Sequence, residues 1–467
     1  MSWSRLLALL AAAVAASTVT AGGTSAACAT SDEVAAFQAA TPAARAAFAR
    51  THRRAKDRAA WDARRRARLQ ALERSALSCA SGRQLLPFFP QAGIVGRDLY
   101  LTNTVDLAPG GAIRDPWCGS RTYDGHTGED VIIRSFREQA IGVPVFAALD
   151  GRVNSVQEGN KDTSYGTQTL PWDNHVLLDA GHGQLQVYGH LRRGSVTVKE
   201  GDWVVAGQQL GLTGSSGNSS WPHLHFTTML DFEPTDPWPG PCRPGPSGWA
   251  QDPAVGDDLY VRDFTFSADG FAGRRNLPWD EATRTGSFAS GRRNVDFRVE
   301  LGNAASVSSV SVRFVRPDGS TALADDPAVG FSRWRQTYGT WRYAVDLDVV
   351  GPWRLLVAFD GHTLVDAPFV VAATRLANRA PMPVTAALTT TAAGVRVCTV
   401  AQDLVHEDPD YDVVRYRYVW RAGGRVVRAV TSAGLADALA RTVRDAVSCT
   451  VTPSDGRLSA PPATATG

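Results

Sequence analysis

The chain has 467 residues, of which 44% are hydrophobic and 20% are charged, and its formal net charge is +2. This length exceeds what a single hydrophobic core supports, so we expect three or four domains. The composition is ordinary for a soluble protein, and no apolar stretch of about 18 residues follows the N-terminal region, so we expect no transmembrane segment.

Residues 1–26 have the features of a secretory signal peptide. Arg5 supplies the positive charge, residues 6–16 form a short apolar run, and small residues follow at Ala21 and Ala26. We therefore expect a secreted, extracellular protein, with the cell wall or the periplasm as alternative destinations.

Residues 27–82 form an arginine-rich segment that we expect to be helical. From residue 32 to residue 78 there is no glycine and a single proline, Pro42, while alanine, arginine, leucine and glutamate dominate. Its basic face has three interpretations: a solvated helix surface, an attachment to anionic wall polymers or nucleic acid, or part of a pro-segment that is cleaved off.

Residues 83–253 change to short β-branched or alternating runs separated by glycines, for example at 143–148, 175–179 and 209–212. This pattern is typical of antiparallel β structure with tight turns. The long polar segment 158–173 is expected to be a loop that frames a substrate groove.

Two further regions have strand-like alternation, and we expect each to be a β-sandwich. The first covers residues 257–372, and the second, residues 384–461, follows a proline-containing linker. In the second, the order Cys398, Trp420, Cys449 is similar to that of immunoglobulin-like domains. The predicted fold class is therefore mainly β, with a short helical segment before the first β domain and two immunoglobulin-like β-sandwich domains after it.

The chain has an even number of cysteines, which in an exported protein favours disulfides over free thiols. None of them has the CxxC spacing of a thiolate metal site. Consecutive cysteines bracket three compositionally distinct regions, and the predicted disulfides are 28–79, 118–242 and 398–449, between Cys28 and Cys79, Cys118 and Cys242, and Cys398 and Cys449.

Six of the nine histidines lie within one 100-residue window of the first β region, namely His126, His175, His182, His190, His223 and His225. Side chains at i and i+2 of a strand share a face, so His223 and His225 are expected to point into one space while Leu224 and Phe226 pack in the core. Likewise, Tyr188 and His190 are expected to share a strand face.

A catalytic zinc site uses three nitrogen or oxygen ligands and leaves one position open. His126, Asp130 four residues later, and one histidine of the His223/His225 pair meet this requirement. Two further histidines nearby can then accept a proton from water and stabilise an oxyanion.

Five blocks in this region resemble lysostaphin/LytM-type zinc metallopeptidases, over about residues 120–232. They are His126-xxx-Asp130, 142–153, Val187-Tyr-Gly-His-Leu191, 198–211 and Pro222-His-Leu-His-Phe226. The resemblance implies Zn²⁺ bound by His126, Asp130 and His225, with His190 and His223 as the unliganded catalytic pair.

The resemblance also implies hydrolysis of peptide bonds in peptidoglycan stems or cross-bridges, often at glycine, with a glycine-rich protein such as elastin as an alternative substrate. The expected partner is peptidoglycan or a cell-wall peptide, and we expect a monomer that does not bind nucleic acid. Two positions depart from the family pattern: Trp221 replaces a small residue, and Thr227 replaces a residue that is often acidic. Trp221 is expected to alter which substrate fits the groove.

Several alternatives stay open from sequence. The chain can be a catalytically inactive relative that regulates other wall hydrolases, or an adhesive or scaffolding exoprotein. Glu129 is a rival ligand to Asp130, Tyr123 is a candidate oxyanion partner, and His175 and His182 are expected to be structural or to line the groove. Asp408, Asp410 and Asp412 allow a Ca²⁺ site, although a polar turn is the expected structure.

Overall fold

The computed structural model describes residues 84–467 except 167, 169, 272–276, 281, 330–334 and 444. The chain is mainly β, as predicted, and α5 (Phe136–Ile141) is the one α-helix among the described residues. The expected signal peptide, the arginine-rich segment and the Cys28–Cys79 disulfide lie outside these residues. No helix in the described part of the chain is long and apolar enough to cross a membrane.

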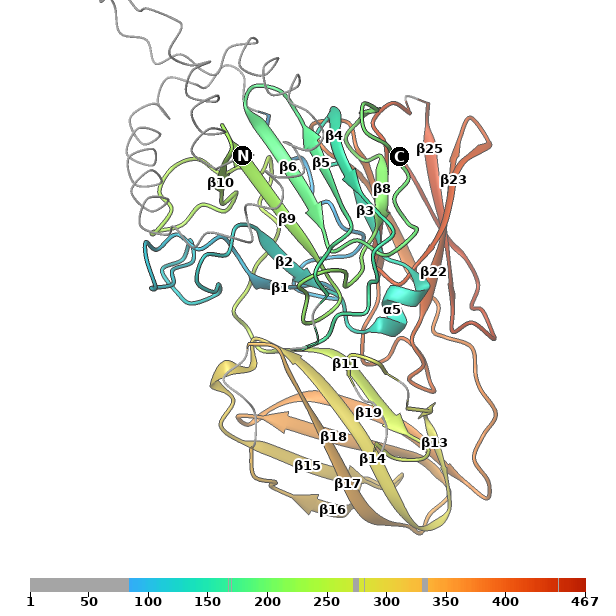
Figure 1. Cartoon of the computed structure of the whole chain (residues 1–467). Coiled ribbons are helices and arrows are strands. Elements are labelled where there is room, and N and C mark those ends of the chain that lie inside the picture. Colours follow the sequence, from blue (N-terminus) through green and yellow to red (C-terminus); the bar gives the residue numbers. More distant parts are fainter. Residues whose placement is uncertain are drawn as a thin grey trace, which may run out of the picture.

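The first β domain is built on an eight-stranded antiparallel sheet in the order β1-β2-β9-β6-β5-β4-β7, with β10 paired to β9 and with β3 and β8 forming a separate pair (Figure 1). Its strands are β1 (Tyr100–Asn103), β2 (Glu129–Ile132), β3 (Pro144–Phe146), β4 (Gly151–Gln157), β5 (His175–Asp179), β6 (Gln184–Gly189), β7 (Trp203–Val204), β8 (Gln209–Leu212), β9 (His223–Leu230) and β10 (Glu233–Thr235).

Strand β9 lies between β2 and β6 inside this sheet, and its two faces have different surroundings. Leu224 and Phe226 are fully buried in the core, which confirms the packing predicted for them. Because side chains alternate along a strand, His223 and His225 are directed to the opposite face. The predicted Cys118–Cys242 disulfide is present, and it joins the segment between β1 and β2 to the segment after β10.

The middle sandwich packs a four-stranded sheet, β12-β11-β14-β17, against a five-stranded sheet, β13-β19-β18-β15-β16, over a phenylalanine-rich core. Its elements are β11 (Tyr260–Ser267), β12 (Arg284–Thr285), β13 (Ser287–Ala289), β14 (Gly291–Gly302), the 3-10 helix η1 (Ala304–Ser306), β15 (Val310–Val315), β16 (Thr321–Asp325), β17 (Thr337–Leu347), β18 (Gly351–Phe359) and β19 (His362–Ala372).

The C-terminal sandwich packs the sheet β20-β21-β24 against β23-β22-β25-β26. Its strands are β20 (Thr385–Thr390), β21 (Arg396–Ala401), β22 (Arg415–Ala422), β23 (Arg425–Ser432), β24 (Ala436–Leu439), β25 (Val447–Ser454) and β26 (Ala463–Thr466). The predicted Cys398–Cys449 disulfide joins the two sheets, and Trp420 is buried opposite Cys449. Strand β26 extends the last sheet past the predicted boundary at residue 461.

The three domains pack against one another. The C-terminal sandwich lies along the β3–β8 side of the first domain, and the middle sandwich lies at one end of both (Figure 1). Val395, Ala433 and Ala438 of the C-terminal sandwich are buried in the core of the first domain. This shared core fixes the position of the C-terminal sandwich on the first domain.

Candidate metal centre

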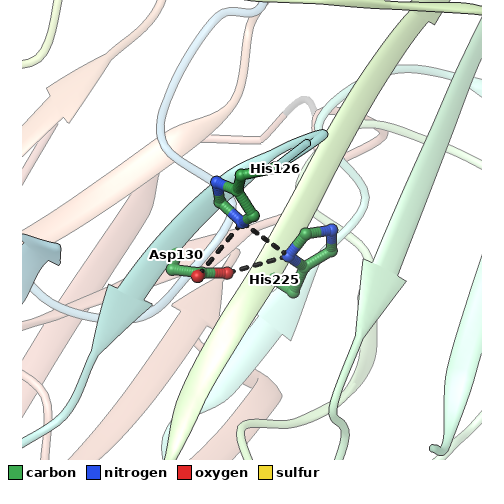
Figure 2. A group of neighbouring side chains, drawn as sticks. All are labelled: His126, Asp130 and His225. Atoms are coloured by element: carbon green, nitrogen blue, oxygen red, sulfur yellow. Dashed lines mark hydrogen bonds and ion pairs between the residues drawn. The ribbon is translucent and has the colours of Figure 1, made fainter. Parts of the chain in front are cut away.

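His126, Asp130 and His225 converge at the junction of β2 and β9 (Figure 2). Asp130 and His225 are register partners across the two strands, and His126 reaches them from the loop before β2. The Nε2 atom of His126 lies 3.1 Å from Asp130 Oδ2 and 3.3 Å from His225 Nδ1, while Asp130 Oδ1 lies 2.8 Å from His225 Nδ1. Within the described residues, this is the one group of histidine, cysteine and acidic side chains arranged to hold a metal ion.

Gly128 allows the loop to pass close to β9. A Cβ atom at this position would lie 2.7 Å from the Phe226 carbonyl oxygen and 3.0 Å from His225 Nε2. Such contacts are too short for any side chain, so this geometry requires glycine at position 128.

Hydrogen bonds orient each of the three side chains. His126 Nδ1 donates to the Thr104 carbonyl at 2.7 Å, so the lone pair of Nε2 faces the cluster. His225 Nε2 pairs with Thr227 Oγ1 at 3.0 Å and leaves Nδ1 toward the cluster, and Asn103 Nδ2 donates to Asp130 Oδ2 at 3.0 Å.

His190 and His223 lie beside the cluster with their ring centroids 4.5 Å apart. Nδ1 of His190 donates to the Ser216 carbonyl, and Nδ1 of His223 donates to the Trp221 carbonyl, both at 2.6 Å. His223 Nε2 lies 3.3 Å from Asp130 Oδ1. The Nδ1 atoms of both rings are therefore bound to backbone carbonyls, and the Nε2 atom of His223 faces the Asp130 carboxylate.

The predicted pairing of His190 with Tyr188 on one strand face is wrong. Strand β6 ends at Gly189, and His190 adopts a left-handed φ of 59°, which turns its ring toward His223. Tyr188 is instead fully buried in the core, where its hydroxyl bonds to Ala148 and Gln186.

The electrostatics differ among the side chains of the cluster. Burial opposes a charge on His126, but the neighbouring Asp130 carboxylate raises the pKa of His126 above its usual value. Burial alone would raise the pKa of Asp130, but His126 and His223 hold it well below its usual range. Burial lowers the pKa of His190 to about 3 and also lowers that of His225. These two imidazoles are therefore neutral at pH 7, which is the form that binds metals and accepts protons.

Two imidazole nitrogens and one carboxylate oxygen form the donor set of a catalytic zinc site with three protein ligands. Each ligand also has a hydrogen bond that fixes its orientation, as such sites require. The cluster therefore fits a bound metal ion.

The remaining candidates lie away from this centre. Glu129 points to the other side of β2, where its Oε2 accepts a hydrogen bond from the Trp238 indole at 2.9 Å, so it does not rival Asp130. His175 lies near Asp173, and His182 is exposed in a turn. The Tyr123 ring lies 4.4 Å from that of His126 and is 52% exposed.

The acidic residues of the C-terminal sandwich form a turn, as expected. Asp408 Oδ1 accepts a hydrogen bond from the Asp410 backbone N–H at 2.7 Å, and Asp410 pairs with Arg379. They form no metal-binding group in the part of the chain that the structure describes.

Sequence reasoning missed the orienting residues Asn103 and Thr104. They lie at the end of β1, more than twenty residues before His126, and their neighbourhood has no motif that points to a metal site. Thr227 was noticeable in the sequence, because it departs from the acidic residue that the family pattern often has at this position.

The family model described as Peptidase family M23 matches residues 125–237, which include His126, Asp130, His190, His223 and His225. This part of the chain belongs to peptidase family M23. The family assignment confirms the resemblance found in the sequence blocks, and the mainly β domain that carries these residues agrees with it.

Two curated proteins are similar to this M23 domain. The peptidoglycan DD-endopeptidase ShyA of Vibrio cholerae is 31% identical over 97 residues, which is 21% of this chain and 20% of that protein. Lysostaphin of Staphylococcus simulans is 40% identical over 91 residues, 20% of this chain and 16% of that protein. The chain thus spans about a fifth of the length of these relatives.

Among solved structures, the catalytic domain of lysostaphin from Staphylococcus simulans is 27% identical and has a TM-score of 0.20. The match covers 30% of this chain and 90% of that domain.

Proposed function

We propose that the protein is a secreted zinc metalloendopeptidase that hydrolyses peptide bonds in bacterial peptidoglycan. The observation that carries the proposal is the convergence of His126, Asp130 and His225 with a second, hydrogen-bonded pair, His190 and His223, beside them. Relatives named as peptidoglycan endopeptidases support the choice of substrate.

In this proposal His126 Nε2, Asp130 and His225 Nδ1 hold the zinc ion. A zinc ion in this position supplies Lewis acidity, which lowers the pKa of water and polarises a peptide carbonyl. The carboxylate of Asp130 brings negative charge to the site, and its low pKa keeps it ionised.

His190 and His223 divide the proton chemistry. His190 is neutral, and its free Nε2 can accept a proton from the attacking water. His223 in its protonated form donates from Nε2 to the oxygen that gains charge during attack on the carbonyl. The backbone carbonyls of Ser216 and Trp221 keep both rings in position for these roles.

The test compares histidine variants of the full chain on purified peptidoglycan. His190→Ala and His223→Ala are each expected to keep their zinc and to lose activity by roughly a hundredfold or more. His126→Ala is expected to lose both zinc and activity. His182→Ala, which removes an exposed histidine outside the cluster, is the matched control and is expected to change neither.

Mass spectrometry of the released fragments identifies the bond. A glycyl-glycine cross-bridge, a D-amino-acid cross-link and elastin serve as separate substrates. Full activity in His126→Ala would overturn the zinc assignment. A wild-type protein that binds zinc but cleaves none of the three would instead favour an inactive relative that regulates other hydrolases.

A further inference from the structure

Three aromatic side chains extend in a row from the metal centre toward the middle sandwich. Trp221 lies two residues before His223, and its ring centroid is 6.4 Å from that of Tyr165, in the long 158–173 loop. The Tyr165 ring is 6.2 Å from that of Trp279, which belongs to the middle sandwich. We call Trp221, Tyr165 and Trp279 the aromatic wall.

The middle sandwich places Trp279 here through a fixed contact between domains. The Trp279 ring stacks on that of Phe136, at the start of α5, with the centroids 4.2 Å apart and the planes at 25°. The Phe136 backbone N–H donates to the Pro278 carbonyl oxygen at 2.6 Å. Asp280, the residue after Trp279, is buried and pairs with both Arg284 and Arg298 at 2.9 Å. These ion pairs anchor the Trp279 segment in the middle sandwich.

The aromatic wall is partly open to solvent. All three rings are half-buried, whereas Phe136 behind them is buried. The indole N–H of Trp221 is already used, because it donates to the Ile133 carbonyl at 2.8 Å. The open surface of Trp221 is therefore apolar ring carbon, which recognises a flat apolar partner rather than a hydrogen-bonding one.

We propose that the aromatic wall binds sugar rings of the glycan strand that carries the scissile peptide, so that the middle sandwich completes the substrate groove. The proposal rests on the proposed function. A pyranose ring has a flat face of C–H groups that packs on aromatic carbon, while a short peptide bridge of small residues has no such face. Trp279 is then a specificity-determining residue contributed by a domain outside the M23 domain.

The test uses two substrates that contain the same peptide cross-link, one on intact glycan strands and one free of sugar. Trp279→Ala is expected to lower kcat/KM on the glycan-linked substrate by about tenfold, the scale of one lost aromatic contact, and to leave the sugar-free substrate unchanged. Trp279→Phe keeps a ring against Phe136 and is expected to fall between wild type and Trp279→Ala. Trp203→Ala, at a tryptophan that is 67% exposed on β7, is the matched control and is expected to change neither rate.

A binding measurement decides the proposal without hydrolysis. The metal-free full chain is titrated with peptide-free glycan strands, and Trp279→Ala is expected to bind at least about fivefold more weakly than wild type. Equal binding by wild type and Trp279→Ala, or an equal loss of kcat/KM on both substrates, would overturn the aromatic wall as a sugar site. A wild type that binds glycan but cleaves neither substrate would contradict the proposed function alone.

Discussion

At the scale of single residues, the proposed metal centre depends on side chains that are not themselves proposed ligands. Thr227 is one of them, since its hydroxyl is the partner of His225 Nε2 and thereby leaves Nδ1 facing Asp130 and His126. It follows His225 on the same strand face, and it is buried. A threonine hydroxyl thus orients the His225 ring, at a position where the family pattern noted in the sequence often has an acidic residue.

Thr227→Val keeps the shape of this side chain and removes the hydrogen bond. We expect zinc affinity to fall by about 10–100-fold, the range typical of lost orienting partners. Competition with a chelator measures it. Thr228→Val is the control on the same strand, because the Thr228 hydroxyl donates to the Thr235 carbonyl and not to the site. Equal zinc affinities for Thr227→Val and wild type would contradict this role.

The histidines and Asp130 were recognisable from sequence because strand periodicity and short spacings relate residues that are close together along the chain. His223 and His225 share a face in any β-strand, and His126 and Asp130 lie four residues apart. Asn103 and Thr104 were not recognisable, because the pairing of β1 with β2 that brings them to the site is a long-range contact. The assignment of roles among the histidines came from the family resemblance.

At the scale of elements, the short helix α5 connects the first domain to both sandwiches. Ser135 caps its N-terminus by accepting a hydrogen bond from the Glu138 backbone N–H. Next to this cap, the buried Arg134 pairs with Glu138 at 2.6 Å and with Glu407 of the C-terminal sandwich at 3.0 Å. Glu407 also accepts a hydrogen bond from the Tyr416 hydroxyl.

Arg134→Ala leaves two buried carboxylates without their cation. We expect the free energy of unfolding to fall by about 3–5 kcal/mol, as is typical when one member of a buried ion pair is removed. Denaturant titration of the full chain measures the change. Arg354→Ala breaks the exposed pair with Asp366 and is expected to cost less than about 1 kcal/mol. Similar losses in both variants would contradict the importance of the buried pair.

Most strands followed from alternation and turn residues, and the runs at 175–179 and 209–212 coincide with β5 and β8. Helix α5 was not predicted from the sequence, because a segment of six residues between buried strands is too short for its hydrophobic periodicity to identify a helix. The contact between Arg134 and Glu407 was also beyond sequence reasoning. A charged residue gives no indication that its partner lies 273 positions away.

At the scale of the whole molecule, the C-terminal sandwich is joined to the first domain by buried groups. The Asp98 carboxylate accepts backbone N–H bonds from Ile94 of its own domain and from Leu435 of the C-terminal sandwich, at 2.7 and 2.8 Å. Burial raises the pKa of Asp98 to about 6, against the opposing effect of these two donors. Sequence alone predicted two sandwiches after the first domain, but not this packing, because the contacting surfaces are ordinary loops and strand ends.

The raised pKa of Asp98 makes stability depend on pH. Between pH 3.8 and about 6 the folded state holds a proton that the unfolded state releases, so the free energy of unfolding falls as pH rises through this window. The loss from this group is on the order of 2–3 kcal/mol. Asp98→Asn is expected to remove that part of the slope in unfolding titrations. The same slope in wild type and Asp98→Asn would contradict the assignment.

The central claim is that His126, Asp130 and His225 hold one catalytic zinc ion. The most direct measurement is zinc content together with peptidoglycan hydrolysis for the full chain as purified, after chelation, and after stepwise return of zinc. We predict about one zinc per chain, loss of hydrolysis with the metal, and recovery that is complete at one equivalent. Unchanged hydrolysis by the chelated protein, or hydrolysis that returns without zinc bound at these three residues, would contradict the claim.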